Sequence, residues 1–374
     1  GLRVVSLRGV QEQLRSSIEK QSVLSEEVRF LAGLQRIEYV FVDQENKDIL
    51  IAGPAEGWVV REDASVVGVD SGRPVLRLED LMVALSTVEA SRKSPISVSI
   101  DPTPEGQARL QNLLSRVRTG PGFNPAQIEP AMRKAFGPQT VSLTTVDKSS
   151  RMAANLVAAD YQMKRLAMKL EDAPINGLPS YMDMIRNVGQ PAGKQPRWWL
   201  EADYDAIEHS ADHTAWRLDG QGVKAMTEDE FVSQSGGRKR TGKSNRFAQQ
   251  WADNFTEKFD LVAKQYSALG EVRNVMDLNV VATIIASHEL EQVSGLSLAN
   301  LRDDEVAMPQ WGTPKQLEPQ CSFVRGSKGW VVSASGGVAL NPWKIVATQM
   351  KEDGSVGRVA AKAAAGRGGN WYWD

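Results

Sequence analysis

The segment Ser94-Pro95-Ile96-Ser97-Val98-Ser99-Ile100-Asp101 places an apolar side chain at every second position, and Thr103-Pro104-Glu105 follows shortly after it. Alternation with a period of two predicts a strand with one buried face. Thr103 suits an N-cap, Pro104 suits the first helical position, and Glu105 lies near the positive end of a helix. We therefore expect a strand followed at once by a helix.

The same alternation of strands and helices extends in both directions from this segment. Apolar residues at three- and four-residue spacing predict helices, and short β-branched or aromatic runs predict strands. The expected helices cover 7–18, 25–34, 78–88, 125–136 and 149–170, and a short acidic helix begins at 227–230. The expected strands cover 37–43, 49–52, 58–60, 140–146, 198–207, 214–218 and 223–226. The pattern predicts an α/β or α+β fold with mixed sheets and packed helices.

The stretch 189–196 is rich in glycine and proline and marks the best domain boundary in the chain. We expect an N-terminal α/β domain over 1–188 and a second α+β domain over 197–350. A helical hairpin is expected at 244–291, because aromatic residues recur at four-residue spacing on its first helix. Residues 351–374 form an Ala/Gly/Arg-rich tail with aromatic residues at its end.

Composition excludes several classes of protein. The 374 residues carry a net charge of -2, which gives no overall attraction to nucleic acid or anionic lipid. No stretch approaches 18 consecutive apolar residues, so we expect no membrane span. A single cysteine, Cys321, excludes an internal disulfide, which fits a reducing cell interior and also an exported bacterial protein without disulfides.

One short motif suggests nucleotide chemistry. Residues 237–244 (GRKRTGKS) match G-x-x-x-x-G-K-[ST], in which Gly237 and Gly242 would admit phosphate, Lys243 would bind it and Ser244 would bind Mg²⁺. The motif requires a buried strand before the loop, whereas the residues before Gly237 are acidic. A solvated basic loop, an anion contact and a nucleotide site all stay open, and we expect the first.

Two of the three histidines, His209 and His213, lie four residues apart. On a helix this spacing would direct both at one metal ion, with His288 or a remote acid as a third ligand. Their flanks predict strands joined by a polar turn, so we expect a solvated turn and no bound cofactor. The aromatic end of the tail, Trp371, Tyr372 and Trp373, is a candidate surface for self-assembly.

Five segments resemble a known family. They are 53–58 (GPAEGW), 71–76 (SGRPVL), 78–81 (LEDL), 95–106 (PISVSIDPTPEG) and 157–168 (VAADYQMKRLAM). These strings resemble the planctomycete domain-of-unknown-function family 1598, with the named domain expected over the first third and similarity to about residue 290. The resemblance implies a bacterial protein, in many cases exported, with no assigned activity and no catalytic residues. Export would account for a chain that starts at Gly1.

No coherent catalytic constellation is found in the sequence. We therefore expect a non-enzymatic exported protein with a binding or structural role, including self-assembly into a homo-oligomer, and no nucleic-acid partner. Two alternatives stay open. One is an enzyme that binds a nucleotide or phosphate ligand through 237–244, and the other is a metal-dependent hydrolase at His209 and His213.

Overall fold

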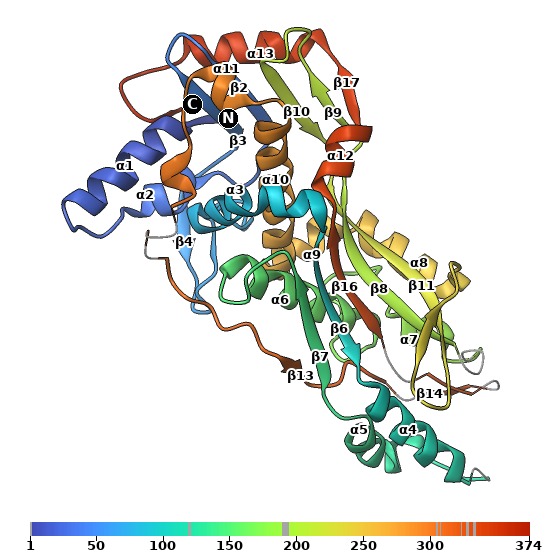
Figure 1. Ribbon diagram of the computed structural model, residues 1–374. Coiled ribbons are helices and arrows are strands. Elements are labelled where there is room, and N and C mark those ends of the chain that lie inside the picture. The colour runs from blue at the N-terminus through green and yellow to red at the C-terminus, as the bar shows by residue number, and fades with distance from the viewer. Residues whose placement is uncertain are drawn as a thin grey trace.

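The computed structural model describes residues 2–118, 121–188, 194–303, 306, 308–322, 324–326, 329–331 and 334–374. Within these residues two seven-stranded sheets are linked by helices (Figure 1). The first sheet has the order β17 (Met350–Glu352), β9 (Ala206–His209), β10 (Ala215–Asp219), β2 (Tyr39–Asp43), β3 (Asp48–Pro54), β1 (Leu2–Ser6) and β18 (Tyr372–Trp373). The second has the order β12 (Arg238–Arg240), β11 (Gly222–Val232), β8 (Lys194–Asp203), β16 (Ser335–Leu340), β6 (Ile96–Pro102), β7 (Gln139–Thr144) and β13 (Gln316–Leu317).

Most strand pairs are antiparallel, and β16–β8 and β17–β9 are parallel. Two small hairpins lie outside the large sheets. They are β4 (Trp58–Val60) with β5 (Val66–Gly68), and β14 (Val324–Gly326) with β15 (Gly329–Val331). The predicted α/β or α+β class with mixed sheets is therefore confirmed.

Helices are present, with shifted ends, at the predicted positions 7–18, 25–34, 78–88, 125–136 and 149–170, and the structure adds helices that the sequence did not predict. The helices are α1 (Leu7–Glu19), α2 (Glu26–Arg29), α3 (Leu78–Lys93), α4 (Pro104–Arg116), α5 (Glu129–Phe136), α6 (Arg151–Ala167), α7 (Tyr181–Ile185), α8 (Arg246–Glu257), α9 (Phe259–Gln265), α10 (Ser267–Ser287), α11 (Leu290–Ser294), α12 (Pro342–Thr348) and α13 (Gly354–Ala365). Thr103 caps α4 by accepting a hydrogen bond from the Gly106 backbone N–H at 3.0 Å, as the sequence predicts. No helix in these ranges is both long enough and apolar enough to cross a membrane.

The predicted helical hairpin takes a different form. Its first arm is split into α8 and α9, and these helices do not pack as one partner of α10. Helix α8 packs on β11, whereas α10 packs on α3, α6 and α12. Nearly every side chain of α10 is buried, as expected for a helix surrounded by other elements and not for one arm of an exposed hairpin.

The predicted boundary at 189–196 does not separate two independent sheets. Strand β10 pairs with β2 in the first sheet, and β16 pairs with both β6 and β8 in the second. Each sheet thus combines strands from before and after the predicted boundary. Residues 189–193 of that boundary lie outside the described ranges. One connected apolar core, from Val5 in the first sheet to Trp198 in the second, joins the two halves.

The acidic stretch 227–230 is a further correction, because it continues strand β11 and does not begin a helix. Thr227 lies opposite Trp198 and Glu230 opposite Gln195 in an uninterrupted register with β8. Main-chain pairing along this long hairpin outweighs the local preference of four polar residues, since strand propensity depends strongly on context.

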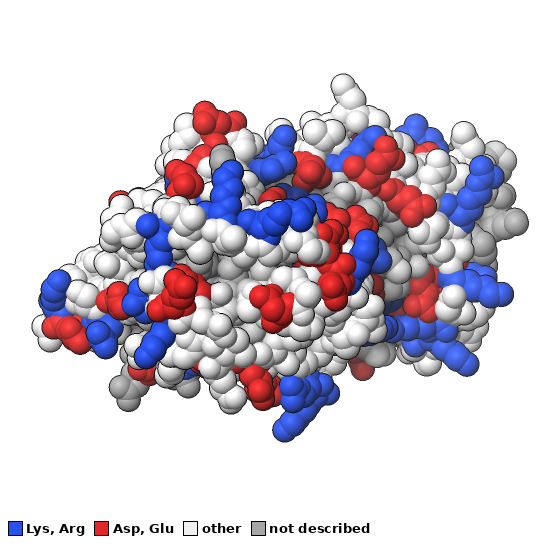
Figure 2. Space-filling view, turned by 90° about the horizontal axis from the view of Figure 1, so that it is seen from above, with Lys and Arg blue, Asp and Glu red and all other residues white. Residues whose placement is uncertain are grey.

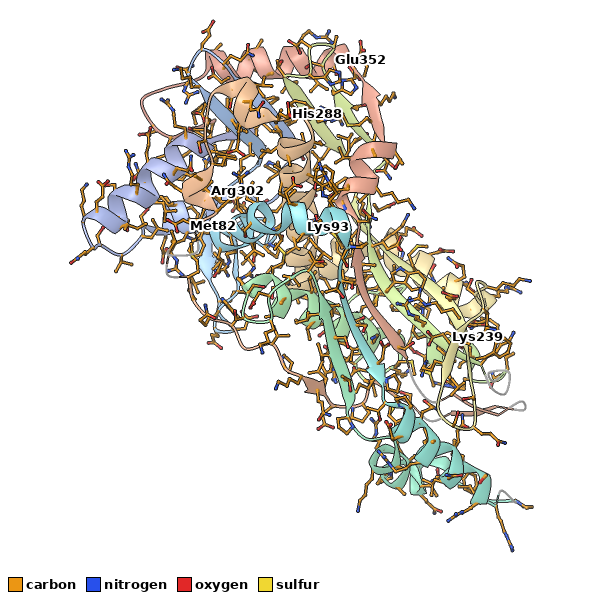
Figure 3. The ribbon with its side chains drawn as sticks, in the orientation of Figure 1. Met82, Lys93, Lys239, His288, Arg302 and Glu352 are labelled. Atoms are coloured by element: carbon orange, nitrogen blue, oxygen red, sulfur yellow. The ribbon has the colours of Figure 1, made fainter. Side chains whose placement is uncertain are left out.

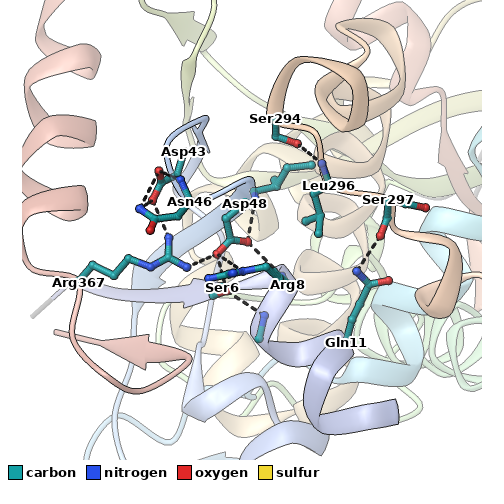
Figure 4. Close-up of polar contacts among 12 residues, drawn as sticks. Ser6, Arg8, Gln11, Asp43, Asn46, Asp48, Ser294, Leu296, Ser297 and Arg367 are labelled. Atoms are coloured by element: carbon teal, nitrogen blue, oxygen red, sulfur yellow. Dashed lines mark hydrogen bonds and ion pairs between the residues drawn. The ribbon is translucent and has the colours of Figure 1, made fainter. Parts of the chain in front are cut away.

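The predicted tail, 351–374, contains a helix and strands that join the fold. Residues 354–365 form α13, and β18 adds an edge strand to β1. Arg367 binds Asp43 and the fully buried Asp48, which also accepts a hydrogen bond from Ser6 Oγ (Figure 4). The end of the chain is therefore built into the first sheet.

Candidate functional site

The second sheet has one apolar and one polar face because its strands alternate. Val98, Trp198 and Val338 are buried in the core on the side of the sheet that α6 and α8 cover. The intervening positions put Ser97, Ser99 and Asp101 of β6 on the same face of the sheet as Arg197 and Trp199 of β8, with β16 between the two strands. A polar cavity of about 490 Å³ lies there, and Arg238 and Arg240 of β12 and Glu230 of β11 complete its charged lining.

The floor of this cavity depends on close backbone contact between strands. Gly336 has φ +135°, and a Cβ atom there would lie 1.6 Å from the Trp198 carbonyl oxygen. Only glycine is compatible with this approach. Its N–H also donates to Asp101 Oδ1 at 3.3 Å, which orients that carboxylate at the cavity.

Glu230 is shared by the groups around it. Arg238 Nε donates to Glu230 Oε2 at 2.7 Å, and Ser335 Oγ donates to the same oxygen at 2.7 Å. Arg197 Nε lies 3.8 Å from Glu230 Oε1. One carboxylate therefore serves two guanidinium groups and a hydroxyl, and its capacity to accept hydrogen bonds is largely used.

The cavity lining includes three guanidinium groups and two carboxylates, and the charge of Glu228 also acts on Arg197. The Arg197 guanidinium lies 4.5 Å from the centre of the Trp199 ring, a cation–π contact. Burial, and next the charge of Arg240, lowers the pKa of Arg197. Arg240 is exposed and makes no ion pair with any described residue. Within the same part of the chain, the Ser97 and Ser99 hydroxyls make no hydrogen bond. The cavity thus offers free hydroxyl donors and the exposed Arg240 guanidinium to an anionic group.

The phosphate-loop match does not have the backbone arrangement that such a loop requires. Residues 238–240 form β12, an antiparallel edge strand against β11, where a phosphate loop needs a buried parallel strand. The Gly242 N–H donates to Glu228 Oε1 at 2.7 Å, so a carboxylate of the same chain occupies the amide that would face phosphate. Helix α8 begins only at Arg246, with Asn245 as its N-cap.

The other residues of the match point to the same conclusion. Lys243 is exposed, and the Ser244 hydroxyl donates to Gln249 Oε1 at 2.9 Å. Gly237 follows the turn that joins β11 to β12. The motif match selects Gly237, Gly242, Lys243 and Ser244. In the structure, the residues of this loop that line a cavity are instead Arg238 and Arg240, which the motif leaves unspecified.

The three histidine side chains pack against one another, but not in the geometry of a metal site. The His209 and His213 rings are stacked with centroids 4.3 Å apart, and His288 from the end of α10 stacks on His213 at 5.6 Å. Stacked rings present their faces to one another, whereas a metal site needs nitrogen atoms that converge. Among the residues described, no group of three or more His, Cys, Asp or Glu could hold a metal ion.

The aromatic end of the tail is used within the fold. The Trp371 carbonyl oxygen accepts a hydrogen bond from the Ser6 N–H at 2.9 Å, and Trp373 Nε1 donates to the Ala363 carbonyl at 2.8 Å. Trp371, Tyr372 and Trp373 are all partly buried. Their contacts bind the chain end to β1 and α13, so self-assembly through these rings stays a prediction.

Sequence inspection missed a buried charge cluster between α3, α6 and α10. Arg151 Nη2 lies 2.6 Å from Glu271, Arg151 also binds Asp80, and its Nε lies 3.6 Å from Glu79. Burial raises the pKa of each of these three carboxyls, and Arg151 opposes the rise. Because one guanidinium binds carboxylates of two other helices, the cluster braces the core. The residues of this cluster come from distant parts of the chain, so no local sequence pattern predicts the cluster.

Comparison with known proteins gives one match. Residues 98–181 match the model of a family described as a protein of unknown function (DUF1598). This confirms the resemblance and corrects its extent, because the match begins in β6 and ends at the start of α7 and does not cover the first third. No curated protein and no solved structure matches the chain. The matched segment contributes Ser99 and Asp101 to the polar cavity.

Proposed function

We propose that this protein is a non-enzymatic binding protein and that it holds an anionic ligand in the polar cavity of the second sheet. The observation that carries the proposal is that three arginines and two carboxylates, Asp101 and Glu230, line one cavity. Guanidinium groups bind carboxylate, sulfate and phosphate through directed hydrogen bonds. The exposed Arg240 is the group that such a ligand would meet first.

A binding role is favoured over catalysis by the state of the carboxylates. Glu230 already accepts hydrogen bonds from Arg238 and Ser335, and Asp101 accepts one from the Gly336 backbone. A general base needs a carboxylate whose lone pairs can reach the substrate. These contacts orient the acids and suit ligand positioning.

Calorimetry with glucuronate, sulfate and phosphate tests the proposal. We expect at least one of these anions to bind the wild type, and Arg240→Gln to weaken it by about tenfold, the loss of one charge-assisted hydrogen bond. Arg197→Gln should weaken it at least as much. The matched control is Arg15→Gln, which removes an exposed arginine on α1, distant in the fold from this cavity. Absence of anion binding, or equal affinity in both cavity variants and the control, would reject the proposal.

A further inference from the structure

The helical hairpin of α4 and α5 begins at the rim of the polar cavity. Pro104, the first residue of α4, is part of the cavity lining. The turn between β11 and β12 touches it, since a Cβ atom on Gly236 would lie 1.9 Å from the Pro104 carbonyl oxygen. From there the hairpin projects away from the sheets at the lower end of the molecule (Figures 1 and 3). Its surface is therefore continuous with the cavity.

This projecting hairpin is basic. Its exposed cations are Arg109, Arg116, Arg118 and Lys134. Of its acids, Glu129 is paired with Arg133 at 2.8 Å, which leaves Glu105 at the start of α4. The upper face of the molecule differs, because blue and red side chains are interspersed there among a majority of uncharged residues (Figure 2). In a chain with a net charge of -2, the surplus on the hairpin is a local feature.

The basic surface is too long for a small anion. Helix α4 has 13 residues, so at about 1.5 Å per residue it extends roughly 20 Å from the cavity rim to Arg116. Arg240 on β12 places an exposed cation at the cavity, whereas Lys239 lies on the opposite face of this strand. A single sulfate or sugar acid in the cavity leaves Arg116 and Arg118 without a function, whereas a chain of anionic units would reach them.

We infer that the ligand is an acidic polysaccharide, bound by one unit in the cavity and by following units along α4. The inference rests on the proposed function. The cavity combines arginines with the hydroxyls of Ser97 and Ser99 and with the carboxylates of Asp101 and Glu230. Sugar hydroxyls can donate to Asp101, of which only Oδ1 accepts the Gly336 N–H, and to the two serine hydroxyls, while uronate or sulfate groups bind the arginines.

A nucleic acid fits the cavity less well. Proteins that bind single strands stack successive bases on several aromatic side chains along a positively charged groove. Here the cavity lining contains one aromatic side chain, Trp199, whose ring is already contacted by Arg197. A DNA backbone also carries no hydroxyl that could donate to the cavity carboxylate of Asp101.

The test compares oligogalacturonates of one, three and eight units by calorimetry at low and moderate salt. For the wild type we expect the octamer to bind at least tenfold more tightly than the monomer. This gain in affinity should become smaller as the salt concentration rises. The double variant Arg116→Gln/Arg118→Gln should keep the monomer affinity and lose most of that gain. Arg15→Gln/Lys20→Gln, with the same change of charge at exposed positions on α1 and at its C-cap, should behave as the wild type.

Each outcome decides between the two proposals. Failure of the monomer and of every other small anion to bind would reject the cavity itself. Monomer binding without a gain for the octamer, or a full gain in the α4 double variant, would reject the polysaccharide path and leave the cavity intact. Tighter binding of single-stranded DNA of equal charge would reject the assignment to sugar.

Discussion

Lys164 Nζ lies 2.7 Å from Asp160 Oδ2, and neither side chain is exposed to solvent. The two residues are one turn apart on α6, and Lys164 also donates to the Ile100 carbonyl oxygen of β6 at 3.1 Å. Burial raises the pKa of Asp160 to about 6, and the charge of Lys164 opposes the rise. The pair therefore joins α6 to the strand whose other face carries Ser99 and Asp101.

Removal of one partner from this pair should be strongly destabilising. We expect Lys164→Met to lower the free energy of unfolding by about 3–5 kcal/mol, because it leaves a buried carboxylate without a counter-charge. The double variant Asp160→Leu/Lys164→Met should recover most of that loss. Urea denaturation followed by circular dichroism measures both. The control is Arg15→Gln in the exposed pair with Glu19, which should change stability by less than about 1 kcal/mol. Equal effects of Lys164→Met and the control would contradict the burial of this pair.

The histidine stack predicts a loss of stability in mild acid. Burial first, and then His213 and His209, lowers the pKa of His288 below its ordinary value of 6.5. The unfolded chain then binds this proton more tightly than the folded chain does. The stability that His288 contributes is present above pH 6.5 and is lost as the pH falls through the folded-state pKa.

Urea midpoints at pH 7.5 and pH 5.5 measure this effect. We expect the midpoint of the wild type to fall with pH, and His288→Gln to reduce that fall because the variant cannot take up the proton. Comparison between the two proteins separates His288 from the carboxylates, which titrate in both. A pH dependence that is the same in the variant and the wild type would show that His288 is not the responsible group.

The ion pairs of Arg367 indicate that the end of the chain stabilises the fold. Its guanidinium lies 2.5 Å from Asp43 and also binds Asp48, which has no solvent exposure. Arg367→Gln should lower the free energy of unfolding by about 1.5–3 kcal/mol, the range for hydrogen bonds to charged groups. Arg358→Gln, at an exposed position on α13, should stay within about 0.5 kcal/mol. If the tail served assembly alone, Arg367→Gln would change the mass measured by light scattering and leave the unfolding midpoint unchanged.

The sequence predicts local elements well because their signals are local. The alternation at 96–100 and the cap at Thr103 are confirmed by β6 and α4. Pairing between distant segments has no such signal, which explains the missed extension of β11 and the joint sheets across 189–196. Asp160 and Lys164 lie four residues apart, a spacing that is the same on an exposed and on a buried helix face, so the sequence alone does not indicate that this pair is buried. The cavity depends on β6, β8, β11 and β12 meeting in one sheet, so only its separate residues were visible in the sequence.

Lys243 gives the last prediction, because its environment separates a binding cavity from a nucleotide loop. The side chain is exposed, and the neighbouring Gly242 amide is held by Glu228. Lys243→Ala should therefore change the free energy of unfolding by less than about 0.5 kcal/mol. Gly242→Ala should cost about 1 kcal/mol or more, because Gly242 has φ +70°, a region that alanine enters only with strain. Calorimetry with Mg²⁺ and ATP or GTP should give the same result for the wild type and for Lys243→Ala. Nucleotide binding by the wild type that disappears in Lys243→Ala would overturn the binding-protein proposal, since it would require the loop to release Glu228 and rebuild its backbone around phosphate.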